Sequence, residues 1–261
     1  MKFSTKLIQY LILCFTSTLL FQSAANAQGQ NATTPVLVEL FTSEGCSSCP
    51  PAENIMKDLC REYGNKMILI SEHVDYWNHL GWKDPFSKYF YTKRQYKYTR
   101  SLDDGAYTPQ VVVNGYCFSG GNNRKAIREN IEFAQKTKFT AGKISQSVNP
   151  PDQTGKLNST VKISIPEYLA PKESVNLCGV LIKNEVISNV KGGENRGNKL
   201  NHKNVVLEFQ TIPNLSMKTP ITQKITFNHI PSDNLELYQI VVFLQGDKSG
   251  RIYLVNAKPA Q

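Results

Sequence analysis

The spacing of apolar residues predicts strands and helices from residue 36 onward. Residues 36–138 are called the first half of the chain below, and residues 143–261 the second half. Residues 36–42 (VLVELFT) and 67–74 (MILISEHV) are short, apolar runs that predict buried strands. Between them, apolar residues recur at helical spacing over 52–63, and Pro50 and Pro51 fit the first turn of a helix. A strand, a helix and a strand within about forty residues form a βαβ unit, so the two strands are expected to be parallel.

The same half continues with further alternating elements. A helix is predicted over 85–101 and a strand over 110–113. Asn114-Gly115 is a strong signal for a two-residue hairpin, so residues 116–119 are expected to return as an antiparallel strand. A last helix is predicted over 122–135. The order β-α-β-α-β-β-α predicts an α/β domain built on a mixed sheet.

After Gly142 the apolar residues follow a different period. Apolar and polar positions alternate along 157–166 (LNSTVKISIP), and several further apolar runs are separated by turn residues. No stretch here has convincing helical spacing. The expected architecture is therefore an α/β domain over 36–138 followed by an all-β, sandwich-like domain over 143–261.

The first residues have the pattern of an export signal. Lys2 and Lys6 precede a largely apolar stretch over 7–21, and Ala25-Asn26-Ala27 offers small residues for cleavage. At about fifteen residues, this stretch is shorter than the roughly 20 that span a bilayer. We therefore expect a cleaved signal peptide over 1–27, a polar tail over 28–35, no stable membrane insertion after cleavage, and a periplasmic or secreted protein.

The charge of the chain adds little about its partners. The 30 basic and 21 acidic side chains give a net charge of +9, and loss of residues 1–27 removes two lysines and leaves 28 − 21 = +7. The basic residues are spread along the chain, which specifies no nucleic-acid partner. Residues 88–100 (KYFYTKRQYKYTR) interleave basic and aromatic side chains as nucleic-acid grooves do. At helical spacing, however, the aromatic residues cover one face and the basic ones are solvated, so no nucleic acid is expected.

Candidate chemistry is concentrated at Cys46-Ser47-Ser48-Cys49, between the first predicted strand and the first predicted helix. Unpaired N–H groups and the positive end of the dipole at a helix N-terminus stabilise a thiolate and lower its pKa. We expect Cys46 to be an exposed nucleophile and Cys49 to be the sheltered thiol that resolves a mixed disulfide. A Cys-x-x-Cys motif in a βαβ unit is typical of thioredoxin-like redox proteins.

Four motifs together carry a resemblance to a known family. VELFTSEGCSSCPPAE, HVDYWNHLGWKDPF, YTPQVVVNG and GENRGNKLNHKNVV resemble a family of secreted bacterial thioredoxin-like proteins of unassigned function. The resemblance spans nearly all of the chain after residue 27 and implies a thioredoxin-like domain over 36–138. It also implies that Cys46 and Cys49 are the redox pair and that Pro109 is a cis-proline. Thr108 would then present backbone groups to an extended substrate chain.

Several residues are candidates for proton transfer or for tuning the cysteines. Thioredoxin has a buried acid six residues before its first cysteine, where this chain has Leu40, and Glu39 faces the other side of that strand. His73 and Asp75 share one face at the carboxyl end of the second strand, where ligands bind in open α/β sheets. Alternatively, His73 and Asp75 bond each other or nearby backbone and hold the following loop. Glu44 is expected to be solvated.

The other cysteines and one polar segment have open alternatives. Cys60 is expected in the apolar stripe of the first helix, and Cys117 and Cys178 either form a disulfide between the two domains or stay free. Residues 192–206 (GGENRGNKLNHKNVV) are polar and glycine-rich and precede a predicted strand, and one interpretation is a long loop on a β-sandwich. The alternative is a polar contact with the first domain or with a substrate, made by Glu194, Asn195, Arg196 and His202.

The function that these patterns predict is that of an exported thiol–disulfide oxidoreductase. It would act on protein or small-molecule thiols and disulfides without a dissociable cofactor, because the two cysteines carry both electrons. One alternative is a copper(I) site of Cys46, Cys49 and His73, whereas a zinc site needs a second ligand pair that the sequence does not offer. Another alternative is a binding protein in which the Cys46–Cys49 disulfide is only structural.

Overall fold

The computed structural model describes residues 35–261 apart from 103–104, 138, 218–219 and 229–233. These residues belong to one compact unit, Thr34–Gln261. The export signal expected over 1–27 lies outside the described residues. Among the helices that are described, none is both long enough and apolar enough to cross a membrane.

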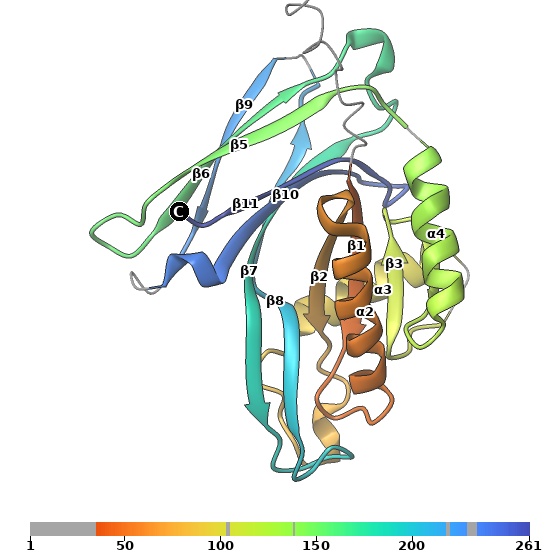
Figure 1. Cartoon of the computed structure of the whole chain (residues 1–261). Coiled ribbons are helices and arrows are strands. Elements are labelled where there is room, and N and C mark those ends of the chain that lie inside the picture. The colour runs from red at the N-terminus through yellow and green to blue at the C-terminus, as the bar shows by residue number, and fades with distance from the viewer. Residues whose placement is uncertain (1–34, 103–104, 138, 218–219, 229–233) are drawn as a thin grey trace, which may run out of the picture. The chain divides into compact units, whose positions relative to one another are not determined.

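The first half contains strands and helices in the order expected from the sequence (Figure 1). β1 and β2 are parallel, while β3 is antiparallel both to β1 and to β4. Asn114 and Gly115 have positive φ values of 47° and 73°, as the predicted two-residue hairpin turn requires. The elements are β1 (Val36–Thr42), α2 (Cys49–Tyr63), β2 (Met67–His73), α3 (Tyr89–Leu102), β3 (Gln110–Val113), β4 (Cys117–Gly120) and α4 (Arg124–Lys136).

The second half is built from strands, as its alternating pattern predicts. Its described residues contain no α-helix, only short 3₁₀ turns between strands. The strands are β5 (Lys143–Asn149), β6 (Leu157–Ser164), β7 (Val175–Asn189), β8 (Lys199–Leu215), β9 (Ile221–Phe227), β10 (Tyr238–Gly246) and β11 (Ile252–Pro259).

One sheet of eight strands crosses the domain boundary that we predicted at 138–143. Its order is β11-β10-β7-β8-β2-β1-β3-β4, so strands of both halves are neighbours. The halves join where β8 runs parallel to β2, with Val205 opposite Ser71. The Ser71 hydroxyl donates to the Lys203 carbonyl (2.7 Å), and the Asn204 side chain donates to the Leu69 carbonyl (3.0 Å). The two halves therefore share backbone pairing in addition to side-chain contacts.

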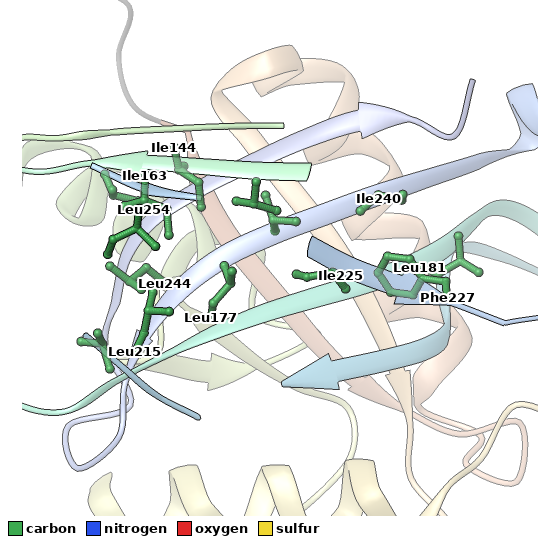
Figure 2. Packing of buried hydrophobic residues seen from close by; sticks show 14 of the residues in the cluster. Ile144, Ile163, Leu177, Leu181, Leu215, Ile225, Phe227, Ile240, Leu244 and Leu254 are labelled. Atoms are coloured by element: carbon green, nitrogen blue, oxygen red, sulfur yellow. The ribbon is translucent and has the colours of Figure 1, made fainter. Parts of the chain in front are cut away.

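Two of the four hydrophobic clusters of the described residues lie one on each side of this junction. In the second half, the small sheet β5-β6-β9 packs on the β11-β10-β7 part of the large sheet (Figure 2). Ile163, Ile225 and Leu244 are among the buried side chains between these two layers. In the first half, Leu40 and Met56 belong to the cluster that α2 and α4 bury against the sheet.

The β7–β8 hairpin is the element that reaches from the second half to the first. Its two long strands pair from Val175 opposite Leu215 to Asn189 opposite Lys199. Figure 1 shows the hairpin extending alongside β2. Of the segment 192–206, for which a long loop was one alternative, the second part is strand, because β8 already begins at Lys199. The connecting turn of the hairpin, residues 190–198, is called the hairpin turn below.

Candidate redox site

Cys46 and Cys49 form a disulfide where the chain passes from β1 into α2. Their Cα atoms are 5.5 Å apart. Ser48 is the N-cap of α2 and Cys49 is its first residue, so the prolines that follow lie in the first turn, as predicted. The Cys46 N–H donates to the Ser43 carbonyl and the Cys49 N–H donates to the Cys46 carbonyl, both at 3.2 Å. The strand-to-helix turn therefore fixes both cysteines.

Both cysteines are fully buried, with 0% of each residue exposed. The prediction of an exposed Cys46 was therefore wrong in this structure, and only Ser47 and Ser48 between the cysteines are exposed. The cause is tertiary, because the hairpin turn of the second half lies on the loop that carries Cys46.

Two side chains of the hairpin turn hold the backbone around Cys46. The Glu194 carboxylate accepts hydrogen bonds from the Ser47 N–H (2.9 Å) and the Ser47 hydroxyl (2.7 Å). The Asn195 amide donates to the carbonyls of Glu44 (2.9 Å) and Cys46 (2.8 Å). The hairpin turn thus forms hydrogen bonds both to N–H and O–H donors and to carbonyl acceptors of the Cys46 loop.

These contacts decide between the two alternatives for the polar segment. Glu194, Asn195 and His202 form the predicted polar contact with the first half of the chain. Arg196, the fourth residue considered, is exposed.

His202 lies between two buried carboxylates that flank the cysteines in sequence. Its Nδ1 is 2.8 Å from Glu53 Oε2 and its Nε2 is 3.2 Å from Glu44 Oε1. Burial of the imidazole opposes protonation, but the hydrogen bonds to Glu44 and Glu53 outweigh burial and raise the pKa of His202 to about 9. The charged imidazolium is therefore the main form at neutral pH.

Each carboxylate of this cluster has a further partner. Thr42 donates its hydroxyl hydrogen to Glu53 Oε1 (3.0 Å), and the Trp82 indole N–H donates to Glu44 Oε2 (2.6 Å). The expectation that Glu44 is solvated was wrong, because Glu44 is fully buried under Trp82 and His202. Glu53 was not among the residues expected at the site, and its one signal in the sequence is its place one helical turn after Cys49.

His73 belongs to the same buried region but has another partner than expected. Its Nδ1 is 2.7 Å from Asp84 Oδ2, an oxygen that also accepts the Glu44 N–H at 2.8 Å. Burial opposes ionisation of Asp84, but His73 and two backbone N–H groups outweigh it and hold the pKa of Asp84 below its usual value. The rings of His73 and His202 touch edge to face, with centroids 4.9 Å apart. Asp84 thus links His73 to the loop before Cys46.

The other two candidates for proton transfer lie against α3 instead. Asp75 accepts the Thr92 hydroxyl at 2.6 Å, so a hydrogen bond between His73 and Asp75 was the wrong pairing. Glu39 is buried and accepts hydrogen bonds from Arg94 (Nε, 2.7 Å) and from the Tyr98 hydroxyl. Both carboxylates hold α3 on the sheet.

Thr108 and Pro109 are joined by a cis peptide bond, as the family resemblance implied. The Thr108 hydroxyl accepts the Trp77 indole N–H at 2.7 Å. A Cβ atom placed on Gly121 would lie 2.7 Å from Pro109 Cβ and 3.0 Å from Ala52 Cβ. Pro109 therefore lies close to the first turn of α2, where Ala52 is the third residue after Cys49.

The remaining cysteines in the described part of the chain are free thiols, so the disulfide considered between Cys117 and Cys178 is not formed. Burial raises the pKa of Cys60 to about 11 and that of Cys178 to about 12, values that keep both thiols protonated at neutral pH. Among the residues that the structure describes, no three His, Cys, Asp or Glu side chains are grouped to hold a metal ion.

A comparison with family models gives one match. The model of a family described as "Protein of unknown function (DUF1223)" matches residues 37–245, which includes strands of both halves and the whole candidate site. A comparison with curated proteins gives no match.

Two solved structures are similar over most of the chain. A protein from Agrobacterium tumefaciens is 23% identical, with a TM-score of 0.64, and the alignment covers 88% of this chain and 96% of that chain. HBP35 of Porphyromonas gingivalis is 16% identical, with a TM-score of 0.62 and coverage of 87% and 75%. Identities this low show a shared fold and carry no conclusion about activity.

Proposed function

The chain belongs to the DUF1223 family of proteins of unknown function, and we propose that it is a thiol–disulfide oxidoreductase whose reacting pair is Cys46 and Cys49. The observation that carries the proposal is their disulfide at the N-terminal end of α2, in a βαβ unit and near the cis Thr108–Pro109 bond. The proposal includes a thioredoxin-like architecture for the first half and export directed by residues 1–27.

The position of the pair supports this chemistry. The first N–H groups of a helix and the positive end of its dipole favour the thiolates that form when the disulfide opens. A substrate thiolate attacks Cys46 Sγ, the Cys46–Cys49 bond breaks, and Cys49 leaves as a thiolate. The second thiolate of the substrate then attacks the substrate sulfur that is bonded to Cys46, which closes the substrate disulfide and releases the Cys46 thiolate. Two electrons pass to the pair and the substrate dithiol becomes a disulfide; the reverse sequence oxidises the pair.

We assign to Thr108 and Pro109 the positioning of the substrate chain. The support is that Pro109 and Ala52, in the first turn of α2, both lie next to Gly121: a Cβ atom there would be 2.7 Å from Pro109 Cβ and 3.0 Å from Ala52 Cβ. No cofactor takes part in this proposal, because the sulfur atoms exchange both electrons with the substrate.

A permanently closed, structural disulfide is the second candidate function for the pair. The observation that favours it is the complete burial of both cysteines. A buried disulfide without access for thiols would hold the start of α2 to the preceding loop and would take no part in exchange.

Trapping of mixed disulfides separates the two candidates. Cys49→Ser leaves Cys46 without its resolving partner. When the Cys46 thiolate attacks a peptide whose cysteine is in a disulfide with a small thiol, the small thiolate leaves, and the mixed disulfide of Cys46 with the peptide should accumulate and be visible by mass spectrometry. Cys60→Ser, which changes a free thiol on the same helix, is the matched control and should accumulate none. If folded Cys49→Ser protein forms no adduct with oxidised peptides, the pair is structural.

A further inference from the structure

The hairpin turn makes backbone-to-backbone contact with the loops around the disulfide. A Cβ atom on Gly192 would overlap the carbonyl oxygen of Gly81, and one on Gly193 would lie 3.3 Å from the Cα of Gly45. Gly193 also has a φ of 67°, in the left-handed region that favours glycine. Residues 192 and 193 therefore need to be glycine for the turn to approach the Cys46 loop this closely.

The groups that the hairpin turn occupies are those that a bound peptide would use. Glu194 accepts from the Ser47 N–H, while Asn195 donates to the carbonyls of Glu44 and Cys46. An extended polypeptide beside Cys46 would offer carbonyl acceptors and N–H donors to the same backbone positions. The hairpin turn thus occupies hydrogen-bonding groups of the Cys46 loop that an extended polypeptide could also use.

His202 anchors the strand that follows the turn. It bonds Glu44, two residues before Cys46, and Glu53, four residues after Cys49. Glu44, Glu53 and His202 are exposed by 5% or less, so water does not compete for these charged contacts. Because His202 holds the start of β8 in place, the hairpin turn could separate from the Cys46 loop while β8 stays paired.

We propose that the hairpin turn determines the substrate class of the site: it excludes small thiols and yields to polypeptide dithiols, whose backbone replaces the hydrogen bonds of Glu194 and Asn195. This inference rests on the proposed redox function of Cys46 and Cys49. A thiolate must reach Cys46 Sγ to react. A small thiol has to wait for the turn to open by itself, whereas a peptide gains hydrogen bonds as the turn leaves.

The test compares two reductants on the oxidised, full-length protein. The rate constant for reduction of the Cys46–Cys49 disulfide is measured with dithiothreitol and with a reduced peptide that carries a Cys-x-x-Cys sequence. In both cases the reductant loses two electrons and closes its own disulfide, while Cys46 and Cys49 become thiols. Alkylation of quenched samples followed by mass spectrometry gives the fraction reduced at each time.

Two variants displace the turn in different ways. Gly192→Ala places a methyl group on the Gly81 carbonyl, and the double variant Glu194→Ala/Asn195→Ala removes the hydrogen bonds to the Cys46 loop. We expect each to react with dithiothreitol about tenfold faster or more than the unmodified protein, the change that corresponds to losing one or two net hydrogen bonds. The preference for the peptide over dithiothreitol should fall by a similar factor. Arg196→Ala, which changes an exposed side chain in the same turn, should leave both rates within about twofold.

The outcomes separate this inference from the function on which it rests. If both turn variants are reduced at the rate of the unmodified protein and keep its preference between the reductants, the turn does not select substrates, although the pair is still redox-active. If no folded form is reduced by either reagent, the redox function itself is excluded. Circular dichroism confirms that each variant is folded, and the double variant serves if Gly192→Ala fails to fold.

Discussion

The imidazole of His202 meets two carboxylates from distant parts of the chain. Glu44 comes from the loop before Cys46 and Glu53 from the first turns of α2, about 150 residues earlier in the sequence. A charged histidine between two buried carboxylates is stable because each partner offsets the cost of burying the other. At the scale of single residues, this cluster ties the second half to the segments on either side of the Cys46–Cys49 disulfide.

The pH dependence of stability should report this cluster. The pKa of His202 in the folded chain is about 9, above the value of about 6.5 expected in the unfolded chain. The stabilisation is therefore complete below pH 6.5 and is lost as the pH rises through 9. In urea unfolding, the difference in free energy of unfolding between the unmodified protein and His202→Gln should shrink by on the order of 2 kcal/mol between pH 6 and pH 10.

His79→Gln provides the control for this measurement. His79 is exposed and its Nδ1 is 2.7 Å from the Tyr76 carbonyl oxygen, so His79→Gln replaces a histidine that lies outside the buried cluster of His202. A difference between unmodified and His202→Gln protein that stays constant from pH 6 to pH 10 would contradict a charged His202 in the folded state.

Local sequence indicated the site residues whose roles depend on near neighbours. The Cys-x-x-Cys spacing and the Thr108-Pro109 pair are local patterns, and the structure shows the disulfide and the cis bond. The burial of Glu44 and Glu53 was not foreseen because a charged residue near a loop or helix start is usually solvated, and the shared partner of these two carboxylates is the distant His202.

At the scale of elements, two turns from different halves meet. Gly115 in the β3–β4 turn lies so close to the β10–β11 turn that a Cβ atom on it would overlap the carbonyl oxygen of Gly250. The Asn114 carbonyl accepts the Ile252 N–H at 2.9 Å, and the Asn114 side chain accepts the Leu37 N–H at 2.8 Å. The small hairpin is thus held on both β1 and β11.

Gly115→Ala should therefore destabilise the chain strongly. The added methyl group meets backbone, which cannot rotate away as a side chain can, and the φ of 73° is unfavourable for alanine. We expect a loss of about 2 kcal/mol or more in the free energy of unfolding, measured by urea titration.

The same hairpin offers a matched control for this substitution. Gly120, at the end of β4, has open space around the position of a Cβ atom. Gly120→Ala should change stability by less than about 1 kcal/mol. If Gly115→Ala and Gly120→Ala lower the free energy of unfolding equally, the close contact between Gly115 and Gly250 does not account for the effect of Gly115→Ala.

The order of elements could be predicted from the sequence, but their partners in the sheet could not. Hydrophobic period and turn residues are local signals, and they gave the strands and helices of the first half and the β-rich second half. The pairing of Ser71 with Val205 joins segments more than 130 residues apart, which no local pattern encodes. The segment 192–206, for which a loop was one alternative, is partly strand for the same reason.

At the scale of the whole molecule, a buried polar cluster joins the halves in addition to the shared sheet. Arg94 of α3 donates to Glu39 of β1 (2.7 Å) and to Gln245 of β10 (2.9 Å). The Gln245 amide in turn donates to the Tyr98 hydroxyl at 2.8 Å. Separation of the halves would expose these groups without their partners, which is costly for a buried ion pair.

The described part of the chain should therefore unfold in one transition. Both tryptophans, Trp77 and Trp82, lie in the first half, so tryptophan fluorescence reports on that half and on the hairpin turn that packs beside Trp82. Hydrogen exchange at the amides of β10 reports on the second half. In urea, the midpoints from the two measurements should coincide within error. Two separate midpoints would show that the halves unfold independently despite the shared sheet.

Electron exchange at Cys46 and Cys49 can be followed directly by a redox titration. The folded protein is equilibrated with buffers of stepped ratios of reduced to oxidised dithiothreitol, then alkylated and weighed by mass spectrometry. We predict a single two-electron transition in the folded protein, absent in Cys46→Ser and unchanged in Cys60→Ser. A Cys46–Cys49 disulfide that stays closed at every ratio until the protein unfolds would contradict electron exchange at this pair.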